Sequence, residues 1–442
     1  MIFNSAIEAT TVNQPGQTDL PARLFVETTT HCNMACPMCV KQTEHSGIVD
    51  GHLPLDIFRT LLPALPSLEA LLLNGIGEPL LHPQLEEFIT LARQDMPAEG
   101  WIGFQSNGLL LDIRRATALA AAGLDRICLS LDAVTPETFA RLRAGGEIGA
   151  MHRAFAALRQ AKKLQPGSRL RSGVEFVVMR ENVRQLPDVL RWASRQGAEF
   201  AIVTQLMPYS MAQLDQVAYG TGTDAAAELF SRWRQRGIEQ GVDILAASLD
   251  SWRSAASRDL KVKSLVEGMK AEARNREIFL NLKELQEQGA TRQHEIAAIF
   301  AEAESVAQSL GMELKLPAIL PRQQRHCAFV EKGGAFIDWT GGVHPCYNLW
   351  HGYRCFVNGW ERTVKPKVFG DLQQKSLQDI WTDEDFRSFR ENVLKYDHSY
   401  CASCGVAPCD YIQAEDFEQD CYLKSEPCGA CLWSMGLLQC LQ

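Results

Sequence analysis

Residues 23–39, RLFVETTTHCNMACPMC, run from a short apolar segment directly into three closely spaced cysteines. The first eight of these residues have the length and the Val, Leu and Phe content of a buried β-strand. Cys32, Cys36 and Cys39 follow on one loop, separated by three and then two residues. Three thiolates on one short loop can face a common centre, and cysteine thiolates hold iron–sulfur clusters. The spacing therefore predicts a three-cysteine cluster site that leaves one iron free for another ligand.

The same three cysteines also fit a zinc site in which His31 or His45 supplies a fourth ligand. The placement favours iron over zinc, because this CxxxCxxC spacing comes directly after the first strand of a series of strands and helices. Zinc is kept as the second interpretation.

Residues 20–210 alternate between short apolar segments and helix-like segments. Strand-like segments lie at 23–30, 68–75, 101–108, 125–132, 170–179 and 199–207. The helix-like segments between them include 83–94, 113–122, 136–143, 150–163 and 184–196. Such a series predicts an α/β fold with a parallel sheet and outer helices, either a partial (β/α)6 TIM-like barrel or an open sheet. Ligands of such folds bind at the carboxyl ends of the strands.

Residues 211–320 have a different composition, and we expect them to form a helical insertion followed by a returning strand. The segment 221–311 contains no proline, is rich in Ala, Glu, Gln, Arg and Lys, and has helical periodicity. The segment ELKLPAIL at 313–320 resembles a strand. A solvated helical hairpin or bundle is the simplest interpretation of the insertion, and a binding role for it is a further hypothesis.

The composition excludes several classes of protein. A chain of 442 residues suggests two or three domains at about 150 residues each. Its net charge of −9 argues against nucleic acid or an anionic membrane as the main partner. The N-terminus lacks the basic start and apolar run of a secretory signal, and no stretch is long and apolar enough to span a bilayer. We therefore expect a cytoplasmic protein, in which 14 cysteines indicate metal or redox chemistry rather than disulfides.

Ten of the cysteines lie at or beyond position 327, in a region that we expect to form a third domain over 321–442. Paired cysteines separated by two residues place two sulfurs within reach of one metal site, and repeated pairs indicate metal binding. The predicted ligands in this region are Cys327, Cys346, Cys401, Cys404, Cys409, Cys421, Cys428 and Cys431. Cys355 and Cys440 are candidates for unused cysteines. Cys128 lies within an apolar strand and is expected to be a small buried hydrophobe.

Five stretches in order over residues 23–208 resemble the radical S-adenosylmethionine (radical SAM) superfamily: the CxxxCxxC loop, GIGEP (75–79), SNG (106–108), SLD (130–132) and LMP (206–208). The resemblance implies a [4Fe–4S] cluster on Cys32, Cys36 and Cys39 whose open iron binds S-adenosylmethionine. Transfer of an electron from the cluster would then yield a 5′-deoxyadenosyl radical. The residues that the resemblance implies to contact S-adenosylmethionine are Gly77, Glu78, Asn107, Ser130, Asp132 and Met207. Met38 departs from the aromatic residue that often precedes the third cysteine, although a thioether can pack on a purine.

The C-terminal cysteines resemble the SPASM extension of radical SAM enzymes, in which two auxiliary [4Fe–4S] clusters are bound. By that resemblance, Cys327 and Cys346 would share one cluster with Cys421. Cys401, Cys404 and Cys409 would hold the other cluster, closed by Cys428, Cys431 or Cys440. The spacings after Cys404 and Cys409 and the additional Cys428/Cys431 pair depart from the SPASM pattern. Structural zinc ribbons are the alternative interpretation.

The resemblance implies an enzyme that abstracts a hydrogen atom from a peptide, a protein or a small molecule, with flavodoxin or ferredoxin as the reductant. The whole chain, including the ending CGACLW (428–433), is similar to SPASM proteins regarded as maturases of metalloenzymes. A radical dehydrogenase or lyase acting on a small metabolite would share every motif. A non-catalytic iron–sulfur electron carrier would not need the GIGEP and SLD motifs.

Overall fold

The computed structural model describes residues 18–43, 46–244, 260–281, 285, 287–404, 409 and 414–442. Within these residues, one ten-stranded sheet has the strand order β12-β9-β8-β1-β2-β3-β4-β5-β6-β7, and a separate hairpin pairs β10 with β11. The strands are β1 (Arg23–Val26), β2 (Ala70–Leu72), β3 (Trp101–Ser106), β4 (Arg126–Ser130), β5 (Arg171–Val178), β6 (Phe200–Gln205), β7 (Glu313–Lys315), β8 (Gly334–Ile337), β9 (Gly342–His344), β10 (Tyr353–Val357), β11 (Trp360–Val364) and β12 (Gly370–Asp371).

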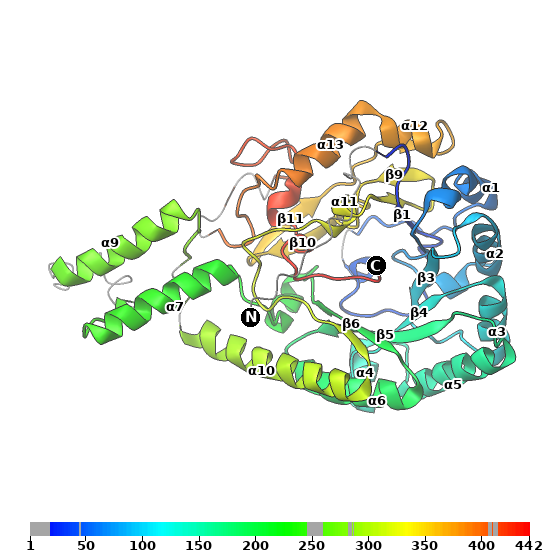
Figure 1. The fold of residues 1–442 in the computed structure, drawn as a ribbon, viewed down its shortest axis with the longest axis horizontal. Coiled ribbons are helices and arrows are strands. Elements are labelled where there is room, and N and C mark those ends of the chain that lie inside the picture. Colours follow the sequence, from blue (N-terminus) through cyan, green and yellow to red (C-terminus); the bar gives the residue numbers. More distant parts are fainter. Residues whose placement is uncertain are drawn as a thin grey trace, which may run out of the picture.

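Strands β1 to β6 pair in sequence order and in parallel, which confirms the predicted partial barrel. Figure 1 shows the helices on the outside of the curved sheet. The helices are α1 (Leu55–Arg59), α2 (Leu85–Asp95), α3 (Ile113–Ala122), α4 (Pro136–Leu142), α5 (Ile148–Leu164), α6 (Leu186–Gln196), α7 (Asp224–Glu239), α9 (Leu260–Asn275), α10 (Glu287–Leu310), α11 (Ala328–Glu331), α12 (Leu377–Thr382) and α13 (Glu384–Leu394).

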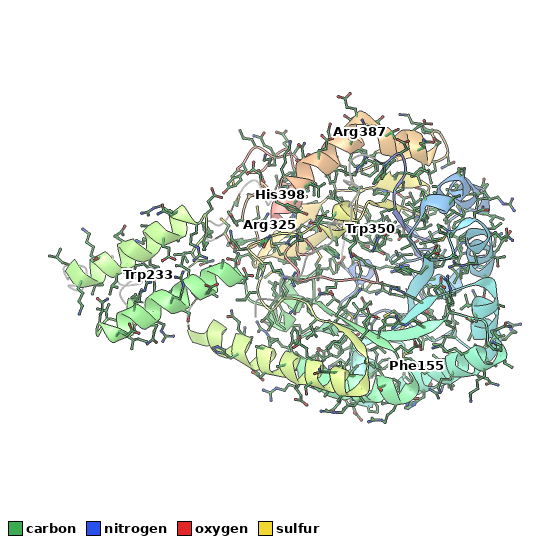
Figure 2. All side chains as sticks on the ribbon, viewed as in Figure 1. Phe155, Trp233, Arg325, Trp350, Arg387 and His398 are labelled. Carbon is green, nitrogen blue, oxygen red and sulfur yellow. The ribbon has the colours of Figure 1, made fainter. Side chains whose placement is uncertain are left out.

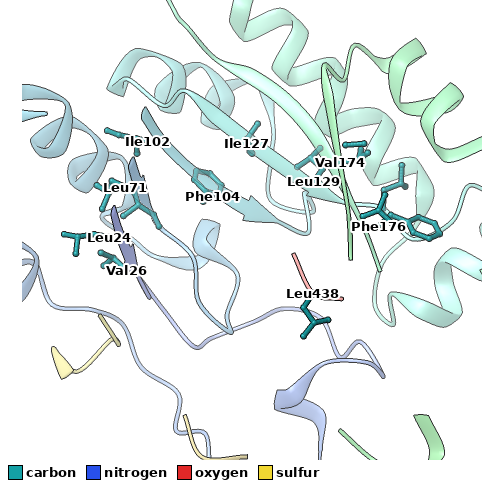
Figure 3. Packing of buried hydrophobic residues seen from close by; sticks show 14 of the residues in the cluster. Leu24, Val26, Leu71, Ile102, Phe104, Ile127, Leu129, Val174, Phe176 and Leu438 are labelled. Carbon is teal, nitrogen blue, oxygen red and sulfur yellow. The ribbon is translucent and has the colours of Figure 1, made fainter. Parts of the chain in front are cut away.

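Local sequence signals explain where the barrel helices begin and end. The Asp112 side chain accepts a hydrogen bond from the backbone N–H of Arg115 and caps the first turn of α3. Gly123 ends the same helix at φ 101°, in the left-handed region that favours glycine. The apolar residues of the strands and of the inner helix faces then pack into one core (Figure 3), with Ile127, Phe104 and Val174 fully buried.

The C-terminal cysteine-rich region is joined to the barrel through strand β8. The sequence pattern did not predict that this strand belongs to the barrel sheet. Strand β8 pairs in parallel with β1 over four residues, and β9 then pairs with β8 in the antiparallel direction. The buried carboxylate of Glu27, just after β1, accepts hydrogen bonds from the backbone N–H of Trp339 at 3.4 Å and of Ile76 at 3.0 Å. His351 Nε2 lies 2.9 Å from the same carboxylate. Strands β8 and β9 therefore form a hairpin that continues the barrel sheet.

The insertion forms two separate helical layers. Helices α7 and α9 pack against each other around a small core of their own, and Figure 1 shows them side by side and extending away from the barrel. Helix α10 instead lies along α6, where Arg191 pairs with Glu302 at 2.9 Å. The predicted strand at 313–320 is observed as the shorter β7, which pairs in parallel with β6. Within the described residues, no helix has both the length and the apolar character needed to cross a bilayer.

The last residues of the chain run through the inside of the barrel. The backbone carbonyl of Leu437 accepts a hydrogen bond from the N–H of Gln205 on β6, and the Gln439 N–H donates to Thr204 Oγ1 at 3.0 Å. Leu437 is fully buried, and Figure 3 shows Leu438 between the strands of the barrel. Nothing in the sequence indicates this placement, because a short apolar segment is equally compatible with packing against many surfaces.

We predict that Leu437→Ala lowers the free energy of unfolding by about 2–5 kcal/mol, because the substitution leaves a cavity in a closely packed core. Urea denaturation followed by tryptophan fluorescence in anaerobic buffer measures the change. Leu164→Ala is the matched control, since Leu164 is 56% exposed and should change the free energy of unfolding little. Equal effects of the two substitutions would contradict the interior placement of the tail.

Candidate active site and auxiliary cysteine groups

A polar cavity of about 250 Å³ lies at the carboxyl ends of β1 to β5. All three cysteines of the first motif line it, together with residues from the loops after β2 and β3 and from β4 and β5. The lining residues are Cys32, Met34, Cys36, Met38, Cys39, Asn74, Gly75, Ile76, Gly77, Glu78, Gln105, Ser106, Asn107, Ser130, Arg143, Glu175 and Val177. Burial raises the pKa of the Cys32 and Cys39 thiols. The structure thus places three thiols beside a polar space, as a cluster with a bound ligand requires.

Glu78 connects two of the loops around this cavity. Its carboxylate accepts hydrogen bonds from Ser106 Oγ and from the backbone N–H of Asn107, each at 2.7 Å, and from the N–H of Leu80 at 3.1 Å. Burial raises the pKa of Glu78, and these hydrogen bonds oppose that shift. Much of the hydrogen-bond acceptor capacity of Glu78 is therefore used within the protein. Glu78 therefore lines the cavity and also fixes the loop after β3 that forms part of its wall.

Gly77 and Asn107 tie the cavity wall to the cysteine loop. A side chain at Gly77 would collide with the backbone, because an added Cβ would lie 2.4 Å from the carbonyl oxygen of Thr29. The backbone N–H of Glu78 donates to the carbonyl of His31 at 2.8 Å. Asn107 Nδ2 donates to Asn33 Oδ1 at 2.7 Å. Three loops that are far apart in sequence are therefore held as one unit.

Of the two residues predicted on β4 and just after it, Ser130 lines the cavity and Asp132 lies behind the lining. Asp132 is fully buried, and its two oxygens accept from the backbone N–H of Val177 at 2.7 Å and from Arg143 Nε at 2.5 Å. Asp132 thereby orients Arg143, which does line the cavity. Arg143 was not among the predicted site residues. It lies in the irregular segment after α4, 11 positions beyond Asp132, so no local pattern links the two residues.

Met207 is also absent from the cavity lining and is buried in the core. Met38 does line the cavity, and it packs against the buried cluster formed by Leu142, Met179 and Leu206. For the zinc interpretation, His31 does not line the cavity and its Nδ1 lies 3.8 Å from Asp50. His45 lies outside the described residues. No three Cys, His, Asp or Glu side chains converge on a single-ion site in the part of the chain that the structure describes.

Three further polar residues line the cavity, and two of them, Gln105 and Glu175, were not among the predicted site residues. Asn74 Nδ2 donates to Gln105 Oε1 at 2.6 Å, and its Oδ1 accepts from the Gln105 N–H at 2.9 Å. Glu175 lies on β5, and burial raises its pKa to about 7 against the opposing charge of Arg143. A charged residue within the apolar strand GVEFVV was the available signal for Glu175.

The proximal group of cysteines consists of Cys327, Cys346, Cys428 and Cys431. Burial and the nearby Cys431 together raise the pKa of the Cys327 thiol to about 12. The same two causes act on Cys346, whose neighbours are Cys431 and Cys327. The residue after Cys346 is Tyr347, whose hydroxyl lies 3.4 Å from Asn74 Nδ2 at the wall of the cavity. The proximal group is thus one buried tyrosine away from the candidate active site.

The distal group consists of Cys401, Cys404, Cys409 and Cys421, which line one cavity of about 210 Å³. Phe279, Val357, Trp360 and Tyr400 also line this cavity and make it largely apolar. Burial raises the pKa of Cys401 and of Cys421, and the neighbouring Asp420 contributes at Cys421.

The observed groups differ from the expected division of ligands. Cys421 lies with Cys401, Cys404 and Cys409, whereas Cys428 and Cys431 lie with Cys327 and Cys346. Spacing alone could not reveal this exchange, because residues 414–427 lead the chain back from one group to the other. Cys355 is fully buried on β10, and Cys440 accepts a hydrogen bond from Gln442 Nε2 at 3.1 Å. Neither thiol has another cysteine among its charged neighbours, which sets both apart from the two groups. Cys128 is fully buried among apolar residues, which confirms that prediction.

The sequence matches two known domains. Residues 26–193 match the radical SAM superfamily, and residues 327–405 match the SPASM iron–sulfur cluster-binding domain. A radical SAM domain binds a [4Fe–4S] cluster and S-adenosylmethionine, and a SPASM domain binds auxiliary iron–sulfur clusters. The cofactor types predicted from the sequence are thereby confirmed, and the two cavities lined by cysteines are the places where the residues fit them.

Three curated relatives differ in how much of the chain they match. The tungsten-containing aldehyde ferredoxin oxidoreductase cofactor-modifying protein of Pyrococcus furiosus is 26% identical over 94% of this chain and 96% of its own length. The PqqA peptide cyclase of Gluconobacter oxydans is 32% identical over 40% of this chain and 47% of its own. The mycofactocin maturase MftC of Mycobacterium tuberculosis is 30% identical over 48% of this chain and 49% of its own length. The chain spans about half the length of the last two relatives.

We predict that Cys421→Ala removes the distal cluster and leaves the proximal one. Iron in the anaerobically reconstituted protein should fall from about twelve to about eight per chain, since each cluster carries four irons. Colorimetric iron analysis measures the loss, and Cys355→Ala, which lies outside both groups, should retain all of the iron. Retention of the distal cluster in Cys421→Ala, together with its loss in Cys428→Ala, would contradict the grouping.

We predict that Glu78→Gln weakens the binding of S-adenosylmethionine by about tenfold or more. The new amide would point an N–H donor at the Asn107 N–H, and an unsatisfied buried donor costs about 1–3 kcal/mol. Equilibrium dialysis of the reconstituted protein measures the affinity. Glu87→Gln is the control, because Glu87 is solvent-facing and lies 3.7 Å from Arg59.

Proposed function

We propose that this chain, which carries a radical SAM domain followed by a SPASM domain, cleaves S-adenosylmethionine reductively and abstracts a hydrogen atom from a peptide, a protein or a metal cofactor during its maturation. The observation that carries the proposal is the single cavity shared by Cys32, Cys36 and Cys39 with the polar residues of four strand ends. A purely electron-carrying protein would have no use for such a cavity.

The residues of the chain divide the work of the site between them. Cys32, Cys36 and Cys39 hold the radical-generating cluster and leave one iron for the amine and carboxylate of S-adenosylmethionine. When bound, the cluster supplies the electron that breaks the carbon–sulfur bond of S-adenosylmethionine and yields the 5′-deoxyadenosyl radical. The fixed guanidinium of Arg143, held by Asp132, presents N–H donors suited to a carboxylate.

The floor of the cavity is suited to a polar substrate. Asn74 and Gln105 are locked to each other, so their remaining donors and acceptors have fixed directions. Glu175, with a pKa of about 7, can accept or supply a proton at neutral pH. These groups lie on the side of the cavity toward Tyr347 and the proximal cysteine group, where a substrate would be placed between the radical and an auxiliary cluster.

Modification of the metal cofactor of an oxidoreductase is the substrate class that we place first. The relative named for that role aligns with nearly all of this chain, across the barrel, the insertion and the cysteine-rich end. The PqqA peptide cyclase and the mycofactocin maturase align with this chain over about half of their own length. Maturation of a peptide is therefore the second candidate, and turnover of a free metabolite is the third.

The auxiliary cysteine groups would carry electrons between the active site and a partner. We propose that the proximal group binds a cluster that exchanges electrons with the substrate through the region of Tyr347. The distal group, with the exposed Cys421, would exchange them with a flavodoxin or ferredoxin.

The central test is the formation of 5′-deoxyadenosine after anaerobic reconstitution with iron and sulfide and reduction by dithionite. We expect formation by the unaltered protein, and a decrease of at least a hundredfold in Cys32→Ala, because that variant cannot complete the cluster site. Cys128→Ala is the matched control, since its thiol is buried among apolar residues and does not line the cavity. Chromatography with mass detection measures the product.

Absence of 5′-deoxyadenosine from protein with full iron content would contradict the proposal, as would equal activity of Cys32→Ala. The substrate class is tested by adding, in separate reactions, an immature metal-dependent oxidoreductase, a candidate precursor peptide and a pool of small metabolites. The substrate should raise 5′-deoxyadenosine formation and gain or lose mass in the same reaction.

A further inference from the structure

The two auxiliary cysteine groups meet at a close backbone contact. Gly429, between Cys428 and Cys431 of the proximal group, packs on Ser399 and Cys401 of the distal group. An added Cβ at Gly429 would lie 2.3 Å from Ser399 Oγ and 3.3 Å from Cys401 Sγ. Glycine is therefore required here, and it lets the two groups approach closely.

The guanidinium of Arg325 is buried at this junction. Arg325 is 6% exposed, and its Nη2 donates a hydrogen bond to the backbone carbonyl of Ser399 at 2.7 Å. Its Nη1 is buried and has no hydrogen-bond partner among the described residues. Figure 2 shows Arg325 and His398 near each other in the C-terminal part of the molecule. A buried charged donor without an acceptor is costly, which indicates that a group outside the polypeptide receives it.

The surroundings of Arg325 show what kind of group that is. Burial lowers the pKa of Arg325, while Tyr400 and three cysteines, Cys401, Cys431 and Cys428, oppose the shift. Two of these cysteines belong to the proximal group and one to the distal group. His398 adds no charge at neutral pH, because burial lowers its pKa. The guanidinium thus faces both cysteine groups at once.

We propose that Arg325 is a shared positioning residue for the two auxiliary clusters, donating a hydrogen bond to one of them and raising the reduction potentials of both. The inference rests on the proposed function, in which both groups hold clusters. A four-thiolate cluster is anionic and gains a negative charge when it is reduced, so a desolvated cation nearby stabilises the reduced form. With Arg325 between them, the reduction of either cluster also becomes electrostatically linked to that of the other.

The distal group has a second buried cation, which makes the expected effect unequal. Arg362 is 4% exposed, and its Nη2 donates a hydrogen bond to the carbonyl of Pro427 at 3.1 Å. Its charge lies close enough to Cys401 to oppose the rise in the pKa of that thiol caused by burial. The distal cluster would keep this charge if Arg325 were replaced. The proximal cluster would lose more, and its potential should therefore fall further.

The test is an anaerobic potentiometric titration followed by electron paramagnetic resonance of the reduced clusters. It uses the full chain with Cys32, Cys36 and Cys39 replaced by Ala, so that the signals come from the auxiliary clusters alone. In Arg325→Met, both potentials should fall. At a fixed potential the ratio of oxidised to reduced proximal cluster should rise at least tenfold, which is 59 mV for a one-electron couple. Arg325→Lys, which keeps the charge, should recover most of the shift.

Arg390→Met is the matched control, because Arg390 is 1% exposed but stacks on Trp381 at 3.7 Å and has no cysteine among its charged neighbours. If Arg325→Met does not fold, Arg325→Gln is titrated in its place, since it can still donate to Ser399. Unchanged potentials in a variant with about eight irons would overturn the inference, and so would a shift confined to one cluster. Iron near zero in the unaltered protein would instead overturn the proposed clusters themselves.

Discussion

The parallel pairing of β1 with β8 is the constraint on which the arrangement of both ends of the chain depends. Strand β1 lies between β2 and β8, so the loop that follows it is fixed from both sides. That loop carries Cys32, Cys36 and Cys39, and the hairpin that begins with β8 carries Cys346. Glu27 strengthens the joint, because its buried carboxylate accepts hydrogen bonds from both the GIGEP loop and the segment after β8. A single strand thus sets the distance between the candidate active site and the proximal cysteine group.

Much of the barrel and of the first site could be predicted, because the relevant signals are local in the sequence. Cys32, Cys36, Cys39, Glu78 and Asn107 stand at the ends of strands whose apolar pattern is clear, and parallel strands bring their carboxyl ends together. Two of the residues predicted to contact S-adenosylmethionine, Asp132 and Met207, do not line the cavity. Asp132 is used to hold Arg143, and Met207 is used in the core, because a buried position at a strand end can serve packing as well as binding.

The ligand grouping and the course of the C-terminus could not be predicted, because both depend on contacts between distant segments. The approach of Gly429 to Cys401 decides which cysteines are neighbours, and nothing in their spacing encodes that contact. The burial of polar groups that have no partner nearby in the sequence could not be predicted either. Arg325 lies in a run of polar residues, which is a pattern typical of a solvated loop. In the folded protein, however, Arg325 is buried. Burial also raises the pKa of most of the cysteines at issue, so metal binding must displace protons from neutral thiols.

The course of the last residues has a consequence for how the protein is made. Because synthesis proceeds from the N-terminus, Leu437 and Leu441 leave the ribosome after every strand of the barrel that they fill. The barrel interior therefore stays incomplete until these residues have been synthesised, and the same holds for the proximal cysteine group, whose Cys431 follows all the described strands in the sequence. Completion of the core and assembly of that group are thereby coupled in time, because both wait for the same short segment that carries Cys431, Leu437 and Leu441.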